Sequence, residues 1–260
     1  TKLYGLAKQF NELTRLYEED KMPNKILLSG LKGIGKSTLA YHLINYVLSK
    51  NEDNSYNFKD LSINKENRTF KLTQNGTNPN LYLIDVNINK KTIDINQIRT
   101  LINDLNKSSF NSKPRFVLID NIEYLNLNSI NALLKILEEP NENIYFILIH
   151  NNKKIIPTLL SRCLNFKISL SNKEINDIIY NLFNKNVDQL VSHDLIDYYY
   201  SPGKIFTLLK LSKDKEIDLQ KIDIKRFLSL LINESLFKED FETKNLLYDM
   251  IEFFLLKKVS

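Results

Sequence analysis

The chain has 260 residues, 43% of them hydrophobic and 26% charged, with a formal net charge of +5 at pH 7 and a pI near 9.0. This length and apolar content exclude a disordered chain and fit one or two globular domains. The single cysteine excludes an internal disulfide and a multi-cysteine zinc cluster, and no apolar run is long enough to span a membrane. We therefore expect a cytoplasmic protein whose basic charge permits contact with nucleic acid without demanding it.

Over the first two-thirds of the chain, apolar residues at helical spacing alternate with short continuous apolar runs. The former predict amphipathic helices and the latter predict buried strands. In chain order we expect a helix at 3–18, a strand at 26–28, a helix at 36–47, a strand at 81–86, a helix at 93–105, a strand at 115–120, a helix at 128–138, and strands at 144–149 and 164–168. Pro23 and Pro140 are expected to follow the ends of helices. The alternation predicts a parallel sheet covered by helices on both faces.

The stretch from residue 51 to residue 80 interrupts this alternation. It is polar and rich in asparagine, with Gly76 and Pro79 near its end. We predict an irregular insert or long loop there. The three histidines, His42, His150 and His193, are far apart and lack the spacing of metal ligands, so we interpret them as packed or polar residues.

Only helices are expected after residue 168. Ser171 and Glu174 form a capping-box pattern that opens a helix at 173–183, and further helices are predicted at 187–199, 202–211, 226–233 and 245–257. A charged break is expected at 214–218. We place boundaries near Leu170 and Ser212, which divide the chain into an α/β domain at 1–169, a small helical domain at 170–212 and a partial helical segment at 213–260.

A glycine-rich loop lies between the strand at 26–28 and the following helix. Its sequence, Gly-Leu-Lys-Gly-Ile-Gly-Lys-Ser, fits the P-loop pattern G-x-x-x-x-G-K-[ST]. Glycines let the backbone point its amides at a phosphate, and the helix adds its positive end. Lys36 would reach the β- and γ-phosphates of ATP, and the Ser37 hydroxyl would hold Mg2+. The predicted nucleotide-binding residues of this loop are Gly30, Gly33, Gly35, Lys36, Ser37 and Thr38; the alternative is an ordinary strand-to-helix turn.

Such a loop needs a carboxylate at the end of a neighbouring strand to hold Mg2+ through water. Asp85 and Asp120 both end apolar strands. We favour Asp120, because a helix, a strand and an arginine-bearing loop follow it, and keep Asp85 as the alternative. Asn121 stands where hydrolysis usually needs a carboxylate, and an amide cannot accept a proton. Glu123 is expected to point elsewhere, so the sequence supports nucleotide binding more strongly than turnover.

Three later motifs resemble AAA+ clamp loader subunits of bacterial DNA polymerase III. The run Asn-Ala-Leu-Leu-Lys-Ile-Leu-Glu-Glu-Pro at 131–140 looks like the helix after the Walker B strand, and Pro-Thr-Leu-Leu-Ser-Arg-Cys at 157–163 resembles the serine-arginine-cysteine motif. Ser-Pro-Gly-Lys at 201–204 resembles the sensor-2 segment. The motifs occur in family order and cover about residues 3–211. The run from His150 to Thr158 and the missing zinc-binding cysteines make the chain most similar to the delta-prime group.

The resemblance implies an α/β AAA+ P-loop NTPase fold, with a parallel sheet, helices on both faces, a small helical lid at 170–212 and the start of a helical collar at 213–260. It implies ATP and Mg2+ as ligands, without zinc. It also implies a hetero-pentamer with gamma/tau and delta subunits, which opens the sliding clamp and places it on primed DNA. No membrane partner is expected.

The resemblance also assigns roles to single residues. Arg162 would be an arginine finger that reaches the γ-phosphate of ATP in a neighbouring subunit, with Ser161 positioning it and Cys163 packing behind it. Lys204 would be the sensor-2 residue, where arginine is usual, and Asn151 the sensor-1 polar group. Arg162 as a surface ion-pair residue and Lys204 as a solvated helix residue remain alternatives.

Two other functions share part of the evidence. A gamma-like motor with its own ATPase activity fits the intact loop with Asp120. A P-loop kinase acting on a small molecule shares only the loop, and nothing in the sequence suggests a site for its acceptor.

Overall fold

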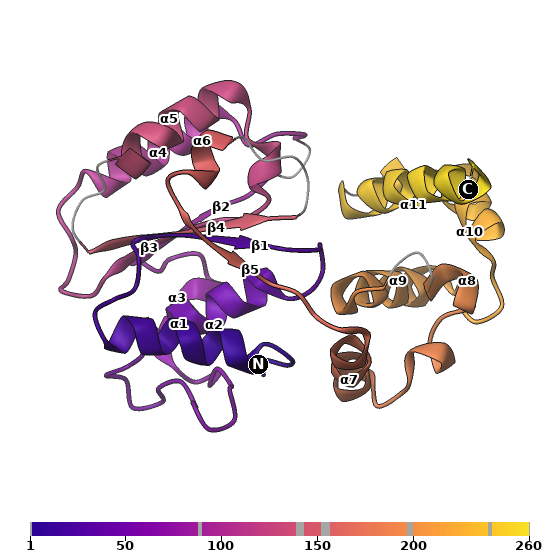
Figure 1. Ribbon diagram of the computed structural model, residues 1–260, viewed down its shortest axis with the longest axis horizontal. Coiled ribbons are helices and arrows are strands. Elements are labelled where there is room, and N and C mark those ends of the chain that lie inside the picture. The colour runs from indigo at the N-terminus through magenta and orange to yellow at the C-terminus, as the bar shows by residue number, and fades with distance from the viewer. Residues whose placement is uncertain are drawn as a thin grey trace. The chain divides into compact units, whose positions relative to one another are not determined.

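The computed structural model describes residues 2–87, 90–138, 143–151, 157–196, 200–238 and 241–259, with backbone alone at 241–242 and 256–259. The chain forms two compact units (Figure 1). The first comprises Thr1–Leu31 and Gly35–Ser169, and the second comprises Lys32–Ile34 and Leu170–Ser260. No helix in the described ranges combines the length and the apolar character needed to cross a bilayer.

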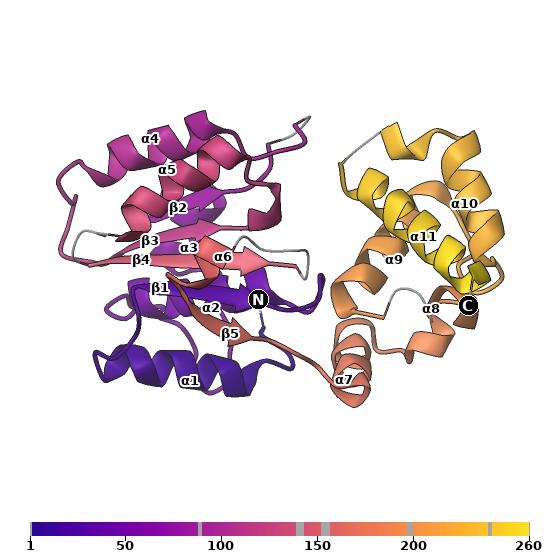
Figure 2. The same ribbon diagram turned by 45° about the horizontal axis from the view of Figure 1, so that its top comes forward.

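The first unit is built on one five-stranded parallel sheet, as the sequence predicts. The strands are β1 (Lys25–Ser29), β2 (Leu81–Ile84), β3 (Arg115–Ile119), β4 (Ile144–His150) and β5 (Leu164–Lys167), in the order β2-β3-β4-β1-β5. One face carries α1 (Ala7–Glu18), α2 (Lys36–Leu48) and α3 (Arg68–Gln74), and the other carries α4 (Ile95–Leu105) and α5 (Leu127–Glu138) (Figures 1 and 2). Because all strands are parallel, their carboxyl ends share one edge of the sheet, where ligands of such folds bind.

Burial follows the apolar pattern of the sequence. The inner strands hide their side chains on both faces, so that Leu27, Phe116 and Phe146 are fully buried. The helices α4 and α5 bury one stripe each. The helix α4 also begins with a capping box between Asp94 and Gln97, which explains why it starts later than the predicted residue 93.

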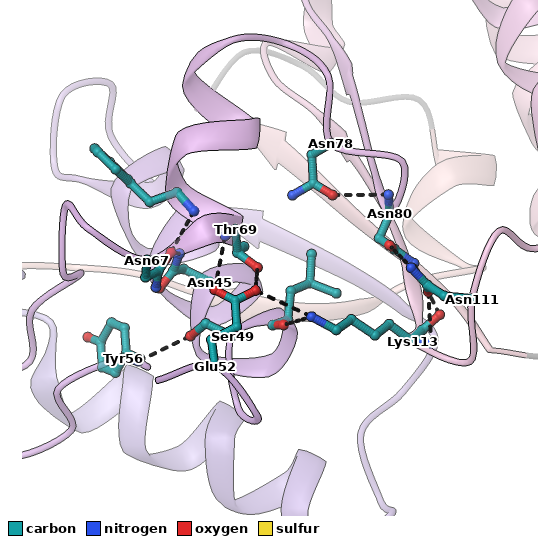
Figure 3. A network of polar contacts seen from close by, with 12 residues as sticks. Asn45, Ser49, Glu52, Tyr56, Asn67, Thr69, Asn78, Asn80, Asn111 and Lys113 are labelled. Atoms are coloured by element: carbon teal, nitrogen blue, oxygen red, sulfur yellow. Dashed lines mark hydrogen bonds and ion pairs between the residues drawn. The ribbon is translucent and has the colours of Figure 1, made fainter. Parts of the chain in front are cut away.

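The predicted irregular insert contains a helix, so the prediction of an unstructured loop is wrong at α3. Asn67 caps this helix by accepting a hydrogen bond from the Phe70 amide at 2.6 Å. The same side chain pairs with Asn45 of α2 through two amide hydrogen bonds of 3.0 and 3.3 Å, and both asparagines are buried (Figure 3). A seven-residue helix is too short to show its periodicity, and its cap depends on a partner 22 residues away.

A carboxylate anchors the other side of the insert (Figure 3). Glu52 accepts hydrogen bonds from the Thr69 amide at 3.0 Å and from its hydroxyl at 2.7 Å. The Lys113 ammonium lies 3.4 Å from Glu52 and donates to the Leu48 carbonyl at 2.6 Å. These contacts lower the pKa of Glu52 although its burial acts in the opposite direction. The insert is therefore fastened to α2 and to the start of β3.

We expect Asn67→Ala to lower the free energy of unfolding by about 2–3 kcal/mol. The substitution removes a helix cap, about 1 kcal/mol, and leaves the buried Asn45 amide without its partner, about 1–3 kcal/mol. Urea unfolding would measure it. Asn75→Ala is the matched control, because Asn75 is exposed at the other end of the same helix, and it should change the free energy by less than ~0.5 kcal/mol. Equal effects of both substitutions would contradict the role of Asn67.

His42 is packed, as the sequence predicts. It is 1% exposed, its Nδ1 lies 2.8 Å from the Tyr56 hydroxyl, and the rings of Phe10 and Tyr56 pack edge-on against it. Burial lowers the pKa of His42 to about 4, first through desolvation. The ring is therefore neutral at pH 7.

The free energy of unfolding should consequently fall as the pH drops from about 6.5 to 4. The unfolded chain takes up the His42 proton near pH 6.5, whereas the folded chain takes it up only near pH 4. The stabilising difference is complete above pH 6.5, is lost as the pH falls, and amounts to at most ~3 kcal/mol. Urea unfolding between pH 4 and 8 would measure this slope. His42→Phe should flatten it, and an unchanged slope in that variant would refute the assignment.

The second unit is helical, as expected. Its elements are α7 (Asn172–Phe183), α8 (His193–Ile196), α9 (Pro202–Lys215), α10 (Ile224–Asn233) and α11 (Phe241–Val259), with short 3-10 turns at Val187–Gln189 and Leu236–Lys238. The capping box is confirmed: Ser171 donates its amide to Glu174 at 2.7 Å, and its hydroxyl accepts from the Glu174 amide. One apolar cluster contains buried residues from both sides of Ser212, and the division into lid and collar stays a prediction.

Several predicted boundaries differ from the structure. The first helix begins at Ala7 rather than residue 3, because Gly5 has a φ of 73° and interrupts the helical backbone. The helix predicted at 187–199 is not continuous: the 3-10 turn Val187–Gln189 and the short helix α8 are separated by non-helical residues, and residues 197–199 lie outside the described part. The helix predicted at 202–211 continues to Lys215, and it ends at Glu216, whose φ is 54°, inside the charged break predicted at 214–218. The short helix α6 (Pro157–Leu160) has no periodic signal in the sequence.

Candidate functional site

The glycine-rich loop follows β1 at the carboxyl edge of the sheet. Gly35 has a φ of 94° and occupies the N-cap position of α2, a backbone conformation that side-chain-bearing residues rarely adopt. A Cβ at this position would also lie 3.3 Å from the Leu6 side chain. The loop thus depends on glycine where the P-loop pattern has it, and it places the amino end of α2 beside the sheet edge.

Lys36 folds back onto this loop. Its side chain is 3% exposed, and its ammonium donates to the carbonyl oxygens of Gly30 at 2.8 Å and Leu31 at 2.6 Å. Phosphate oxygens are stronger acceptors for an ammonium than neutral carbonyls, because both partners are then charged. The Lys36 ammonium is thus held at the loop, where the phosphates would lie in the predicted site.

The structure brings the two predicted Mg2+ residues together. The Ser37 hydroxyl donates a hydrogen bond to the Asp120 carboxylate. Burial raises the pKa of Asp120, the Ser37 hydrogen bond opposes this, and the nearby charge of Asp85 raises it further. A divalent cation would relieve this excess of negative charge, and Mg2+ is usually bound by one or two such oxygen ligands together with water and phosphates. Ser37 and Asp120 therefore fit a Mg2+–nucleotide complex, although no cluster of three or more His, Cys, Asp or Glu occurs in the described residues.

Both polar atoms of the Asn121 side-chain amide form hydrogen bonds. The residue has a φ of 54°, its Nδ2 donates to Asp85 at 2.9 Å, and its Oδ1 accepts from Asn151 at 2.9 Å. Asn151 also donates to Glu123 at 3.1 Å. The expectation that Glu123 points elsewhere is therefore wrong: the 3-10 turn Ile122–Tyr124 returns its carboxylate to the same group. The amide at 121 orders its neighbours but offers no base.

Arg162 follows α6 and lies at the surface of the first unit. Its side chain is 31% exposed, and its Nη2 forms an ion pair with Glu138 Oε1 at 2.6 Å. Its Nη1 donates to the Thr158 carbonyl at 3.1 Å and lies 3.5 Å from the Ser161 hydroxyl, while Nε is buried without a partner among the described residues. The guanidinium is therefore held by its own chain, with one-third of the side chain open to solvent.

Glu138 is a partner that the sequence analysis did not identify. It belongs to the motif at 131–140, but its pairing with Arg162 spans 24 residues and is visible only in the fold. Residues 139 and 140 of that motif, and with them the predicted helix end at Pro140, lie outside the described residues, as does Asn152.

Two further predicted residues have clear environments. Cys163 is partly buried, and this burial raises the pKa of its thiol to about 11, so it packs rather than acting as a nucleophile. Lys204 lies in the first turn of α9, where the Ser201 hydroxyl caps its amide. Burial lowers the pKa of Lys204, and the charge of Asp249 opposes that shift. Contact between Lys204 and a nucleotide remains a prediction.

Comparison with known proteins adds independent information. The family described as DNA polymerase III, delta subunit, matches residues 5–172. The chain is 28% identical over 190 residues to the DNA polymerase III subunit delta' of Buchnera aphidicola subsp. Schizaphis graminum, covering 72% of this chain and 56% of that protein. It is 34% identical over 149 residues to the DNA polymerase III subunit gamma of Buchnera aphidicola subsp. Acyrthosiphon pisum, covering 57% of this chain and 39% of that protein.

A solved structure is also similar. It is a DNA polymerase III gamma subunit-related protein from Thermotoga maritima, 19% identical, with a TM-score of 0.49, and the match covers 89% of this chain and 66% of that chain. The chain spans about half the length of the curated relatives it matches.

Proposed function

This chain belongs to the family described as DNA polymerase III, delta subunit, and we propose that it is a delta-prime-type subunit of a clamp loader. In this role it binds ATP with Mg2+ at residues 30–38 and Asp120. It turns ATP over slowly or not at all, and it supplies Arg162 to the nucleotide site of a neighbouring subunit. Its proposed partners are gamma/tau and delta subunits in a hetero-pentamer that loads the sliding clamp on primed DNA.

The observation that best supports this proposal is the amide side chain at position 121. An amide occupies the position after Asp120, where it donates one N–H to Asp85 and accepts one hydrogen bond from Asn151. A water beside the γ-phosphate would find no carboxylate at position 121 to take its proton. The loop, Lys36 and the Ser37–Asp120 pair nevertheless fit Mg2+–ATP. Binding with little hydrolysis agrees with a subunit whose part in catalysis is Arg162.

Nucleotide binding and turnover can be separated in the purified chain. Titration with labelled ATP, with and without Mg2+, should give saturable binding that Mg2+ strengthens, while phosphate release stays at background. Rapid phosphate release, with loss of that activity in Lys36→Ala, would refute the delta-prime assignment.

Assembly tests the second part of the proposal. The chain should co-elute with purified gamma/tau and delta subunits, using the full-length protein if the chain continues beyond residue 260. Failure to join those subunits would end the clamp loader proposal, whatever the result of the ATP titration.

A gamma-like motor with its own ATPase activity is the second candidate. The intact loop and the contact between Ser37 and Asp120 favour it, as does the similarity to gamma subunits. It requires a base other than Asn121, and Glu123, whose carboxylate contacts Asn151, is the candidate for that role. The phosphate-release measurement on the isolated chain decides between the two candidates.

A further inference from the structure

A cavity of about 340 Å³ lies in the first unit between α2, α3 and the start of β2. Its walls include Thr38, Tyr41 and His42 from α2, Phe70 and Thr73 from α3, and Leu81 from β2. All described lining residues are uncharged. This size is at the lower end of small-ligand pockets, and the lining combines aromatic rings with a few polar groups, as ligand sites do.

We propose that this cavity binds an uncharged heteroaromatic ring with polar atoms on its edge, the chemistry of a nucleobase. The lack of charged side chains in the described lining disfavours a charged ligand, which would lose its hydration without an ion-pair partner. The rings of Tyr41 and Phe70 suit the face of a planar ligand, on which stacking is tolerant of ring identity.

The accessible hydroxyl and amide side chains of the lining, those of Thr38, Thr73 and Gln74, are the argument for a ligand with polar atoms. His42 plays a different part. Its ring is 1% exposed and lines the cavity. Nδ1 is paired with the Tyr56 hydroxyl at 2.8 Å, whereas Nε2 is buried and has no hydrogen-bond partner among the described residues. Because Nε2 has almost no accessible surface, a ligand in the cavity does not reach this atom, and His42 contributes to the shape of the wall.

The cavity is preformed by the network drawn in Figure 3. Asn67 and Thr69 fasten the start of α3 to Asn45 and Glu52, so Phe70 and Thr73 are held over α2 before any ligand arrives. A preformed site avoids the cost of ordering its walls on binding. Thr38 also directly follows Ser37, so a ligand in the cavity would contact the same helix that begins at the phosphate loop.

Two sources could supply such a ring: a free nucleoside, or a base of a DNA strand turned out of its stack. The proposal concerns the shared ring and does not depend on clamp loading. Saturation-transfer NMR with adenosine and thymidine, in the presence of saturating inorganic triphosphate and Mg2+, tests it while the phosphate loop is occupied by a ligand that carries no base. We expect saturable binding of at least one nucleoside.

The variants place that binding at the cavity. Thr73→Trp fills the space and should weaken binding at least tenfold. Thr77→Trp is the matched control, because Thr77 is exposed and outside the lining, and it should bind like wild type. If Thr73→Trp does not fold by circular dichroism, Gln74→Trp replaces it, since Gln74 is an exposed lining residue.

A second arm identifies the source. The fluorescence of 2-aminopurine, as the free riboside and within primed DNA, should change on adding protein and should not change with the cavity-filling variant. A response from the riboside alone assigns the site to a free ligand, and a response from both admits a DNA base. No nucleoside binding, binding abolished by inorganic triphosphate, or equal binding by Thr73→Trp and Thr77→Trp would overturn the proposal.

Discussion

Arg162→Ala should lower the ATPase rate of the reconstituted clamp loader about 10³-fold at the site this chain completes, while leaving the chain's own affinity for ATP unchanged. An arginine supplied across an interface stabilises the charge that develops on the transferred phosphate, and such residues contribute about 10³–10⁵ in rate. The loss should appear in kcat rather than in KM, because the interaction is strongest in the transition state.

The contacts of Arg162 are compatible with this proposed role. Its guanidinium is held by Glu138 at 2.6 Å and by the Thr158 carbonyl at 3.1 Å, and one-third of the side chain is exposed. An exposed ion pair of this kind contributes little to stability, so exchanging Glu138 for a phosphate costs little. The triphosphate offers the guanidinium several oxygens in the geometry that its planar donors match.

Three variants control this prediction. Arg162→Lys keeps the charge but loses the paired donors, and it should recover only part of the rate. Arg99→Ala removes an exposed arginine from α4 and should leave the complex fully active. Glu138→Gln should alter the ATPase rate only if the ion pair positions the arginine. Steady-state kinetics would measure the rates of all three variant complexes. Equal rates for Arg162→Ala and wild-type complexes would refute the role of Arg162.

The sheet and the loop were predictable because their signals are local. Continuous apolar runs specify buried parallel strands, and the glycines with Lys36 and Ser37 stand within eight consecutive residues. The proximity of Ser37 and Asp120 follows from the strand order, since parallel strands end at one edge. Assigning the strands was not sufficient to predict this contact, because β4 lies between β1 and β3 and Asp85 follows β2 at the same edge; the order of the motifs along the chain favoured Asp120.

The contacts that the sequence did not reveal all join distant residues. Asn45 and Asn67 are 22 residues apart, and Glu138 and Arg162 are 24 residues apart. No sequence pattern of asparagine, glutamate or arginine indicates which distant residue each will pair with. Glu123 was misjudged because the spacing was taken as regular, whereas a 3-10 turn after Asn121 redirects its side chain. Polar pairing of this kind depends on the finished fold, so sequence periodicity carries no information about it.

Lys36→Ala should weaken ATP binding by the isolated chain roughly 30- to 100-fold. The ammonium is buried beside the loop carbonyls of Gly30 and Leu31, so it needs no large movement to meet a phosphate there. A hydrogen bond that involves charged groups contributes about 1.5–3 kcal/mol, and Lys36 would meet two phosphates of the nucleotide. Isothermal titration with ATP and Mg2+ would measure the change.

Lys32→Ala provides the matched control for this substitution. Lys32 lies in the same loop but is exposed, and exposed charges contribute little to binding because water and salt screen them. Its removal should change the affinity less than threefold. If both variants weaken binding equally, the effect comes from the net charge of the loop. If Lys36→Ala binds ATP as tightly as wild type, the nucleotide does not lie at this loop. A specific loss with Lys36 alone, in a variant that unfolds at the wild-type urea concentration, assigns the phosphates to the geometry of residues 30–37.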